Sequence, residues 1–245
     1  MNGRVGPECP LRLDITNNAM SLITADEYVE QLSSCKRCAA LLAQKPVDPA
    51  NSTEAVKPRP IVRMPTARKV MLIGQAPGLN EYRSNSPFSG QAGRDVRELF
   101  EECGFNAEQF EKQVFTSAVA KCFPGSKLTK RRRGEGFRRE DLKPSTIMLN
   151  NCRPFLLAQL ELVSPSLVVL LGGMALEAYI ELRTGKRTRG ALENYVGKVE
   201  DWMGRRVIPL AHTSGGSFWL NDPGNKALQA EAKRLLAVEL TRLPR

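Results

Sequence analysis

Histidine is almost absent from this chain, and long apolar runs are absent altogether. One residue in 245 is a histidine, so any chemistry that needs an imidazole depends on His212. No apolar run approaches the roughly 20 residues that span a bilayer, so we expect no membrane association. The N-terminus has no basic segment followed by an apolar core, which indicates no secretion signal and predicts a cytoplasmic protein.

Acidic residues are outnumbered, and the surplus of positive charge indicates a polyanionic partner. Lys and Arg total 36 against 26 Asp and Glu, which gives a formal net charge of +10. Counterion release favours nucleic acid as that partner, although an acidic metabolite also fits the charge. The hydrophobic content of 42% is enough for one α/β domain with extensions.

Short apolar runs alternate with helical patterns from residue 70 onward. Strands are expected at residues 70–73, 114–119, 167–171 and 207–210. Helices are expected from Thr24 to Ser34, at 93–103 and 145–163, after Gly172, and after the N-cap Asp222. This alternation predicts an α/β fold, a three-layer αβα sandwich with a central, mainly parallel four-stranded sheet.

The remaining segments predict how the domain is organised. Residues 1–23 are expected to form an N-terminal lead, and residues 24–245 a single domain. Five prolines between residues 45 and 67 are incompatible with a helix or a central strand, so this segment is a connection.

Two glycine-containing segments follow the first expected strand, where parallel sheets place their ligand sites. The first reads Gly74, Gln75, Ala76, Pro77 and Gly78. It is either a tight turn that exposes backbone to a ligand or a plain connection. It has neither the spacing of a dinucleotide fingerprint nor a Walker lysine, so nucleotide hydrolysis is unsupported.

The second segment, residues 87–95, opens a helix and contains Phe88 and Gly90. Exposed amides at a helix N-terminus suit a phosphate. Phe88 is either a ring that stacks on a base or an ordinary core aromatic.

His212 follows the last expected strand in a loop rich in serine and glycine that includes Ser214. A lone histidine is usually structural or exposed. At the carboxyl end of a strand, however, an imidazole can donate to an oxyanion that develops on a departing base. Residues 218–220, Phe-Trp-Leu, are either a wedge for a duplex or part of the core.

Residues 127–139 form a basic run with a single acid, Glu135. Its cations are Lys127, Lys130, Arg131, Arg132, Arg133, Arg138 and Arg139. Charge runs usually form solvated faces, but this imbalance and the glycines favour contact with a polyphosphate.

The six cysteines are better explained as ligands, catalysts or core residues than as disulfides, because thiols stay reduced in the cytoplasm. Cys35 and Cys38 form a Cys-x-x-Cys pair that suits zinc, an iron–sulfur cluster or redox chemistry. Cys122 ends a strand and Cys152 lies on a helix, either as ligands or as buried thiols. The spacing lacks the second close pair common in structural zinc modules.

Together these segments resemble the iron–sulfur branch of the uracil-DNA glycosylase superfamily, especially its family 4 and family 5 members. The resemblance runs from Cys35 to about Leu243. It implies a [4Fe–4S] cluster on Cys35, Cys38, Cys122 and Cys152, and leaves Cys9 and Cys103 as free thiols.

The resemblance also implies roles for the other motifs. The turn at residues 74–78 would border the base, and Phe88 would stack on the flipped base. His212 would stabilise negative charge on it, and Ser214 would hold a phosphate. Leu171-Gly172 matches a further family motif at the end of a strand.

Two positions depart from family 4. Gln75 stands where family 4 has an acidic residue that positions water; Asn80, Glu81 and Asp95 are nearby candidates, and Gln75 or Asn80 is our choice. Ala118 stands where family 4 reads the uracil edge with asparagine, as in family 5, so a broader pocket is expected. The basic run has no histidine, so the covalent capture of DNA seen in a related branch is not expected.

The implied function is a monofunctional DNA glycosylase that removes uracil or another deaminated base in base excision repair. It would act as a monomer on single- or double-stranded DNA of the nucleoid. The main alternative is an iron–sulfur nucleic-acid-binding protein of the same fold with a degenerate active site. A zinc-containing binding module and an enzyme for a small acidic substrate are further alternatives.

Overall fold

The computed structural model describes residues 23–131, 135–212 and 218–243. Its strands are β1 (Val70–Gly74), β2 (Val114–Ala118), β3 (Ser126–Lys130), β4 (Phe137–Asp141), β5 (Leu167–Leu171), β6 (Glu200–Trp202) and β7 (Arg205–Leu210). Its helices are α1 (Ala25–Ser33), α2 (Ala39–Leu42), α3 (Leu79–Ser84), α4 (Gln91–Glu102), α5 (Ala107–Gln113), α6 (Thr146–Val163), α7 (Gly173–Thr184) and α8 (Pro223–Thr241), with 3-10 turns η1 (Leu192–Asn194) and η2 (Phe218–Asn221).

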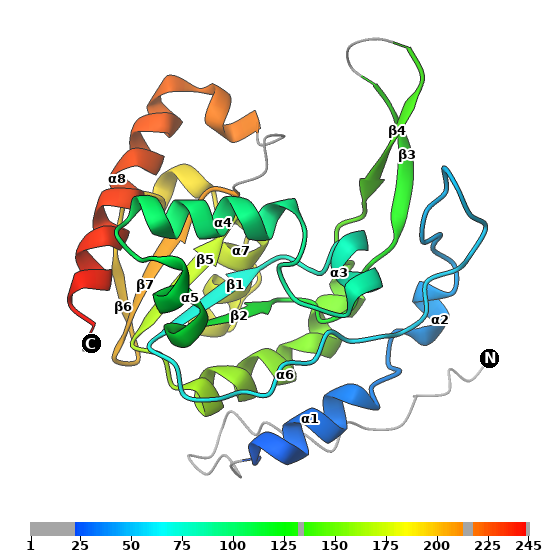
Figure 1. Ribbon diagram of the computed structural model, residues 1–245, viewed down its shortest axis with the longest axis horizontal. Coiled ribbons are helices and arrows are strands. Elements are labelled where there is room, and N and C mark those ends of the chain that lie inside the picture. Colours follow the sequence, from blue (N-terminus) through cyan, green and yellow to red (C-terminus); the bar gives the residue numbers. More distant parts are fainter. Residues whose placement is uncertain (1–22, 132–134, 213–217, 244–245) are drawn as a thin grey trace.

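The central sheet has the strand order β2-β1-β5-β7-β6 (Figure 1). The first four strands are parallel, and β6 pairs with β7 in the antiparallel direction. Of these, β1 and β5 are buried and apolar over nearly their whole length because helices cover both faces of the sheet. The carboxyl ends of the four parallel strands lie along one side of the sheet, which we call the sheet edge, as distinct from an edge strand.

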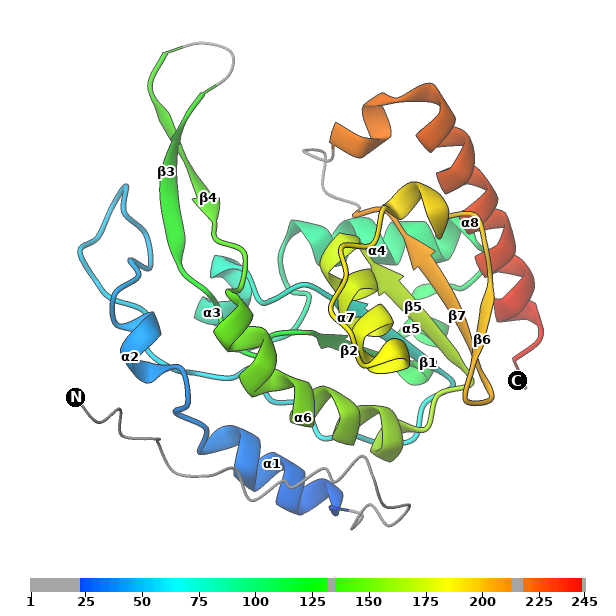
Figure 2. The same cartoon turned by 180° about the vertical axis from the view of Figure 1, so that it is seen from behind.

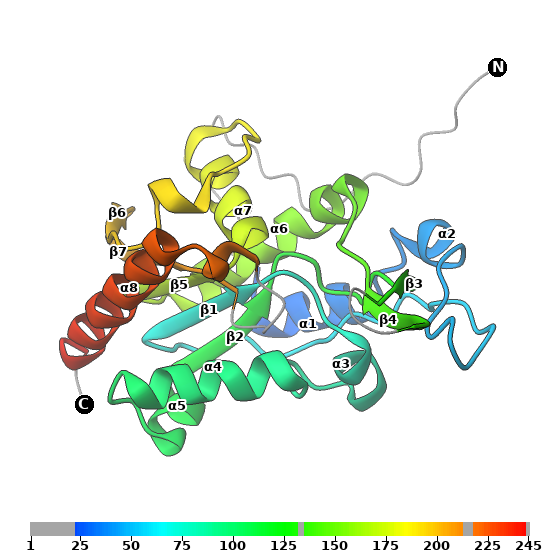
Figure 3. The same cartoon turned by 90° about the horizontal axis from the view of Figure 1, so that it is seen from above.

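Each face of the sheet has its own core, as alternate strand residues point to opposite sides. Val70 and Leu72 of β1 pack with α4, α5 and α8, whereas Met71 and Ile73 pack with α6 and α7. Figure 3 shows these helices on the two sides of the sheet. The predicted αβα sandwich is thus confirmed.

Capping interactions fix the helix starts that the sequence predicts. The Thr24 hydroxyl accepts from the Glu27 amide, and the Glu27 carboxylate accepts from the Thr24 amide, which completes a capping box for α1. Ser145 and Asp222 cap α6 and α8 in the same way from the N-cap side. Each cap satisfies an amide that the first helical turn leaves without a partner.

The expectation of four strands in the sheet was wrong, because β6 adds a fifth. This strand contains Glu200 and Asp201, is only partly buried, and lies at the edge of the sheet. An edge strand needs few apolar residues, so β6 has no apolar run from which the sequence could predict it. The basic run at 127–139 also contains strands, β3 and β4, which pair antiparallel in a separate two-stranded sheet.

The proline-containing segment 45–67 has no helix or strand, only one isolated bridge between Pro46 and Ala55. Apart from Ile23, the N-terminal lead expected at 1–23 lies outside the described residues. Among the helices described, none combines the length and apolar character needed to cross a membrane.

Candidate functional site

Four candidate positions lie at the carboxyl ends of neighbouring parallel strands. Gly74 ends β1 and pairs with Ala118 at the end of β2. Gly172 follows β5, and His212 lies two residues beyond the end of β7. Since the strand order is β2-β1-β5-β7, the fold brings these positions together along one edge of the sheet.

Phe88 lies against Gly74 because the glycine has no side chain. A β-carbon on Gly74 would stand 3.0 Å from Phe88 Cζ. The Phe88 backbone has a φ of 52°, which is uncommon for a residue with a side chain. Its carbonyl accepts from Arg97 Nη1 at 3.1 Å, and a β-carbon on Gly93 would meet that carbonyl oxygen at 1.8 Å. The ring is therefore fixed by its own backbone as well as by its neighbours.

Glu81 joins the two glycine-containing segments. Its Oε2 accepts from the Gly78 amide at 3.0 Å and its Oε1 from the Gly90 amide at 2.8 Å. The residue is only 9% exposed. Both carboxylate oxygens are thus engaged by backbone, so Glu81 is a positioning group for the two turns and a poor candidate for binding the catalytic water.

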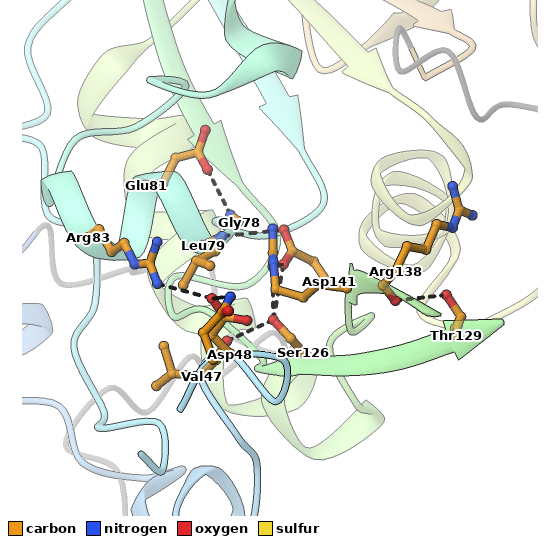
Figure 4. A network of polar contacts seen from close by, with 12 residues as sticks. Val47, Asp48, Gly78, Leu79, Glu81, Arg83, Ser126, Thr129, Arg138 and Asp141 are labelled. Atoms are coloured by element: carbon orange, nitrogen blue, oxygen red, sulfur yellow. Dashed lines mark hydrogen bonds and ion pairs between the residues drawn. The ribbon is translucent and has the colours of Figure 1, made fainter. Parts of the chain in front are cut away.

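Asp141, at the end of β4, is a second carboxylate at this turn that the sequence did not single out. Its Oδ2 accepts from the Leu79 amide at 3.3 Å and would lie 2.8 Å from a β-carbon on Gly78 (Figure 4). The β3–β4 hairpin is therefore bonded to the residue that directly follows the turn at 74–78.

His212 packs against Gly172. A β-carbon on Gly172 would lie 3.3 Å from His212 Cβ and 3.4 Å from Cδ2. Burial lowers the pKa of His212, and the nearby Asp95 carboxylate opposes that shift. The imidazole therefore favours its neutral form, which donates from one nitrogen, at neutral pH.

The remaining residues of the first turn differ in exposure. Gln75 and Ala76 are half-buried, Pro77 is buried and Asn80 is exposed on α3. The Gln75 carbonyl accepts from the Ala120 amide at 3.1 Å. The Gln75 and Asn80 side chains are therefore both candidates for positioning the catalytic water.

The four cysteines of the expected ligand set converge from three parts of the chain. Cys38, Cys122 and Cys152 belong to one buried cluster, and Ala76 of the first turn packs against it. Burial, together with the charges of Cys38 and Cys35, raises the pKa of Cys152 to about 11. The charges of Cys152, Cys35 and Cys38 add to the effect of burial in raising the pKa of Cys122, so the four thiols interact electrostatically. No disulfide joins the described cysteines, and Cys103 lies apart in the sheet core.

Hydrogen-bond donors surround these sulfurs. The Lys121 amide points at Cys152 Sγ over 3.4 Å, and Asn151 Nδ2 donates to Cys38 Sγ at 3.3 Å. In the described ranges, no three His, Cys, Asp or Glu side chains are arranged to hold one metal ion.

Lys121 links this cluster to the sheet edge and was missed by sequence reasoning. Its buried ammonium group donates to the Ala118 carbonyl at 2.7 Å and to the side chains of Ser117 and Gln159. Burial lowers its pKa to about 7. The lysine directly before Cys122 was the available signal, because burial of a lysine requires dedicated partners.

Several candidates are placed differently or not described. Arg131 is exposed directly after β3, whereas Arg132, Arg133, Ser214 and Cys9 lie outside the described residues. Trp219 packs against the sheet core, and its indole nitrogen lies 3.4 Å from Glu193 Oε2. Trp219 is thus half-buried against the sheet core, as Phe88 is.

Comparison with known proteins finds one family and several relatives. The model of the uracil DNA glycosylase superfamily matches residues 62–236. The type-4 uracil-DNA glycosylase of Thermotoga maritima is 31% identical over 147 residues, which are 60% of this chain and 65% of that protein. Those of Archaeoglobus fulgidus and Sulfurisphaera tokodaii are each 25% identical, over 76% and 88% of this chain and 78% and 85% of their own lengths.

Proposed function

Because this chain belongs to the uracil DNA glycosylase superfamily, we propose that it is a monofunctional DNA glycosylase. It hydrolyses the N-glycosidic bond of uracil or another deaminated base, as the first step of base excision repair. The names of its relatives support uracil as a substrate.

One observation carries the proposal: two functional side chains lie on glycines at the ends of neighbouring strands. Phe88 lies on Gly74 after β1, and His212 lies on Gly172 after β5. Each glycine leaves room that a side chain would fill. A flat ligand entering at this edge meets an aromatic ring and an imidazole donor, which suits a flipped base.

The reaction follows from what these side chains do. Phe88 stacks on the flipped base, and neutral His212 donates a hydrogen bond to its carbonyl oxygen. The C1′–N bond breaks with its electron pair moving to the base, whose negative charge the imidazole stabilises. Water, positioned by Gln75 or Asn80, then adds to C1′ and gives up a proton, which leaves an abasic sugar.

Four thiolates from Cys35, Cys38, Cys122 and Cys152 would hold a [4Fe–4S] cluster. The largely buried all-sulfur donor set and its hydrogen-bond donors support this. When bound, the cluster would supply a crosslink between the N-terminal segment, the loop after β2, where Cys122 lies rather than at a strand end, and α6. A brown protein with iron and sulfide is expected; a colourless protein with zinc contradicts the assignment.

Base preference is the part of the function that Ala118 and Gln75 affect most. Ala118 offers a methyl group where an asparagine would read the uracil edge, so a broader pocket is proposed. The test is excision from oligonucleotides that contain uracil, hypoxanthine or xanthine, followed by alkali cleavage of abasic sites. Cleavage of uracil and at least one purine lesion is expected; no cleavage of any of them contradicts glycosylase activity.

A second candidate is a nucleic-acid-binding protein of the same fold with a degenerate site. The replacement of an acidic residue by Gln75 favours it. This candidate predicts salt-dependent DNA binding without an abasic product in the same assay. In either case we propose a monomer that acts on nucleoid DNA in the cytoplasm, with the basic run at 127–139, Arg131, Arg132 and Arg133 included, on the phosphates.

A further inference from the structure

The β3–β4 hairpin carries apolar side chains that the body of the protein does not cover. Phe137 is 64% exposed and Leu128 is 42% exposed. The two strands pair only with each other. Figures 1 and 2 show the hairpin standing clear of the central sheet and its helices. Core packing therefore does not account for an aromatic side chain at this position.

The register places these apolar residues on one face. Lys130 pairs with Phe137, and Leu128 pairs with Arg139. Directly paired residues project to the same side of a sheet, and so do residues two apart along a strand. Leu128, Lys130, Phe137 and Arg139 therefore share one side of the hairpin, which we call the stacking face.

Positive charge lies on both faces of the hairpin. Lys130 lies on the stacking face, and the exposed Lys127 and Arg138 belong to the other face. Arg131 continues the basic character beyond the end of β3. An exposed aromatic ring among cations is the combination that binds single-stranded nucleic acid, through base stacking and phosphate contact.

The root of the hairpin is fixed next to the candidate site. Ser126 Oγ donates to the Val47 carbonyl at 2.8 Å, and Asp141 accepts from the Leu79 amide directly after the turn at 74–78 (Figure 4). The stacking face is therefore held at a defined side of the site. If the flipped base lies on Phe88, the strand that flanks it can reach the hairpin.

We propose that the stacking face binds an unpaired base of the strand that flanks the flipped nucleotide, so that this protein prefers single-stranded over duplex DNA. In a duplex, both faces of a base are covered by its neighbours, whereas an unpaired base can lie on Phe137 while Lys130 contacts a phosphate. The inference rests on the proposed function in taking DNA as the ligand.

The test measures binding to undamaged oligonucleotides, so it is independent of excision. Fluorescence anisotropy of a labelled single strand and of its duplex is compared for the full-length protein and for Phe137→Ala. We expect Phe137→Ala to weaken single-strand binding about tenfold and duplex binding less than about twofold. Met203→Ala is the matched control, because Met203 is 73% exposed but lies in the β6–β7 turn.

Phe137→Trp gives a direct readout of stacking. Single-stranded DNA should bind this variant with unchanged affinity and quench the fluorescence that the new indole adds to the wild-type signal. Equal losses for both DNA forms in Phe137→Ala, no loss for either, or an unquenched indole overturns the proposal. An inactive protein whose Phe137→Trp indole is quenched contradicts the glycosylase proposal alone.

Discussion

Phe88 and Phe137 are two aromatic side chains with opposite surroundings. Phe88 is held by the contact with Gly74, by the close approach of Gly93 and by Arg97 on its carbonyl. Phe137 is mostly exposed on a two-stranded hairpin. A ring that must orient a base for bond cleavage has to be fixed from several sides, because small displacements cost rate. A ring that stacks on any base of a bound strand needs only one exposed face and nearby positive charge.

The sheet edge and the hairpin also differ in the burial of their charged groups. At the sheet edge, Glu81 is buried and both its oxygens accept from amides, and burial shifts the pKa of His212. On the hairpin, Lys127, Lys130 and Arg138 are exposed. We therefore expect substitutions at the sheet edge to alter the excision rate or stability, and substitutions on the hairpin to alter DNA affinity and its salt dependence.

The largest effect is expected for His212→Ala. Loss of a donor to the developing negative charge should reduce the single-turnover rate on a uracil oligonucleotide by about 10²–10³. The measurement uses excess enzyme so that binding does not limit the rate. Affinity for undamaged DNA should stay unchanged. Full excision activity in this variant would remove His212 from the mechanism.

Gly74→Ala should disturb the same site without removing a functional group. Its methyl would stand 3.0 Å from Phe88 Cζ, so the ring has to move. We expect the single-turnover rate to fall about 10- to 100-fold, as misplacement of a reacting group does. The control is Gly173→Ala, where nothing lies within 4 Å of the added carbon. Equal activities of the two variants would show that the Phe88–Gly74 contact does not position the base.

Glu81→Gln tests the link between the two turns. The amide group cannot accept from both the Gly78 and the Gly90 N–H, so one buried donor loses its partner. The free energy of unfolding should fall by about 1–3 kcal/mol in chemical denaturation. Glu140→Gln, an exposed change on the hairpin, should stay within about 0.5 kcal/mol of wild type. An unchanged free energy of unfolding in Glu81→Gln would show that the two turns do not depend on the Glu81 carboxylate.

The sequence predicted those parts of the molecule in which burial leaves a pattern. The strands β1 and β5 are continuous apolar runs because both their faces are covered, and β7 ends in one. Thr24, Ser145 and Asp222 mark helix starts. The strands β3, β4 and β6 have no such pattern, since they are exposed and rich in charge. Edge and isolated strands are specified by partners that a local reading does not see.

The candidate site divides in the same way. The glycine-containing turns and His212 stand out locally, because each follows an apolar strand. The bond between Glu81 and the Gly78 amide also has a local signal, because the two residues have the spacing of an N-cap and its N3 acid in a capping box. Its bond to Gly90 depends on the path of α3, and the contact of Asp141 with Leu79 spans 62 residues. Neither follows from spacing.

Lys130→Ala should alter affinity through charge alone. If Lys130 contacts one phosphate, the slope of log affinity against log salt should fall in magnitude by about one for this variant. Lys112→Ala is the control, because Lys112 lies on α5 and pairs with Glu108. The measurement is anisotropy of an undamaged single strand over a series of salt concentrations. An unchanged slope for Lys130→Ala would show that the hairpin does not meet the backbone.

The smallest effect is a pKa change at the sheet edge, where burial and Asp95 act on His212 in opposite directions. His212 is the only histidine in the chain, so its C2 proton gives an unambiguous NMR titration. We expect a midpoint below the ordinary value of about 6.5. Asp95→Asn removes the negative charge that favours imidazolium, so the pKa should fall further. A rise in Asp95→Asn would contradict the sign of this interaction. A wild-type midpoint at the ordinary value would mean that His212 is solvated as hairpin residues are, and the contrast between the two regions would not extend to it.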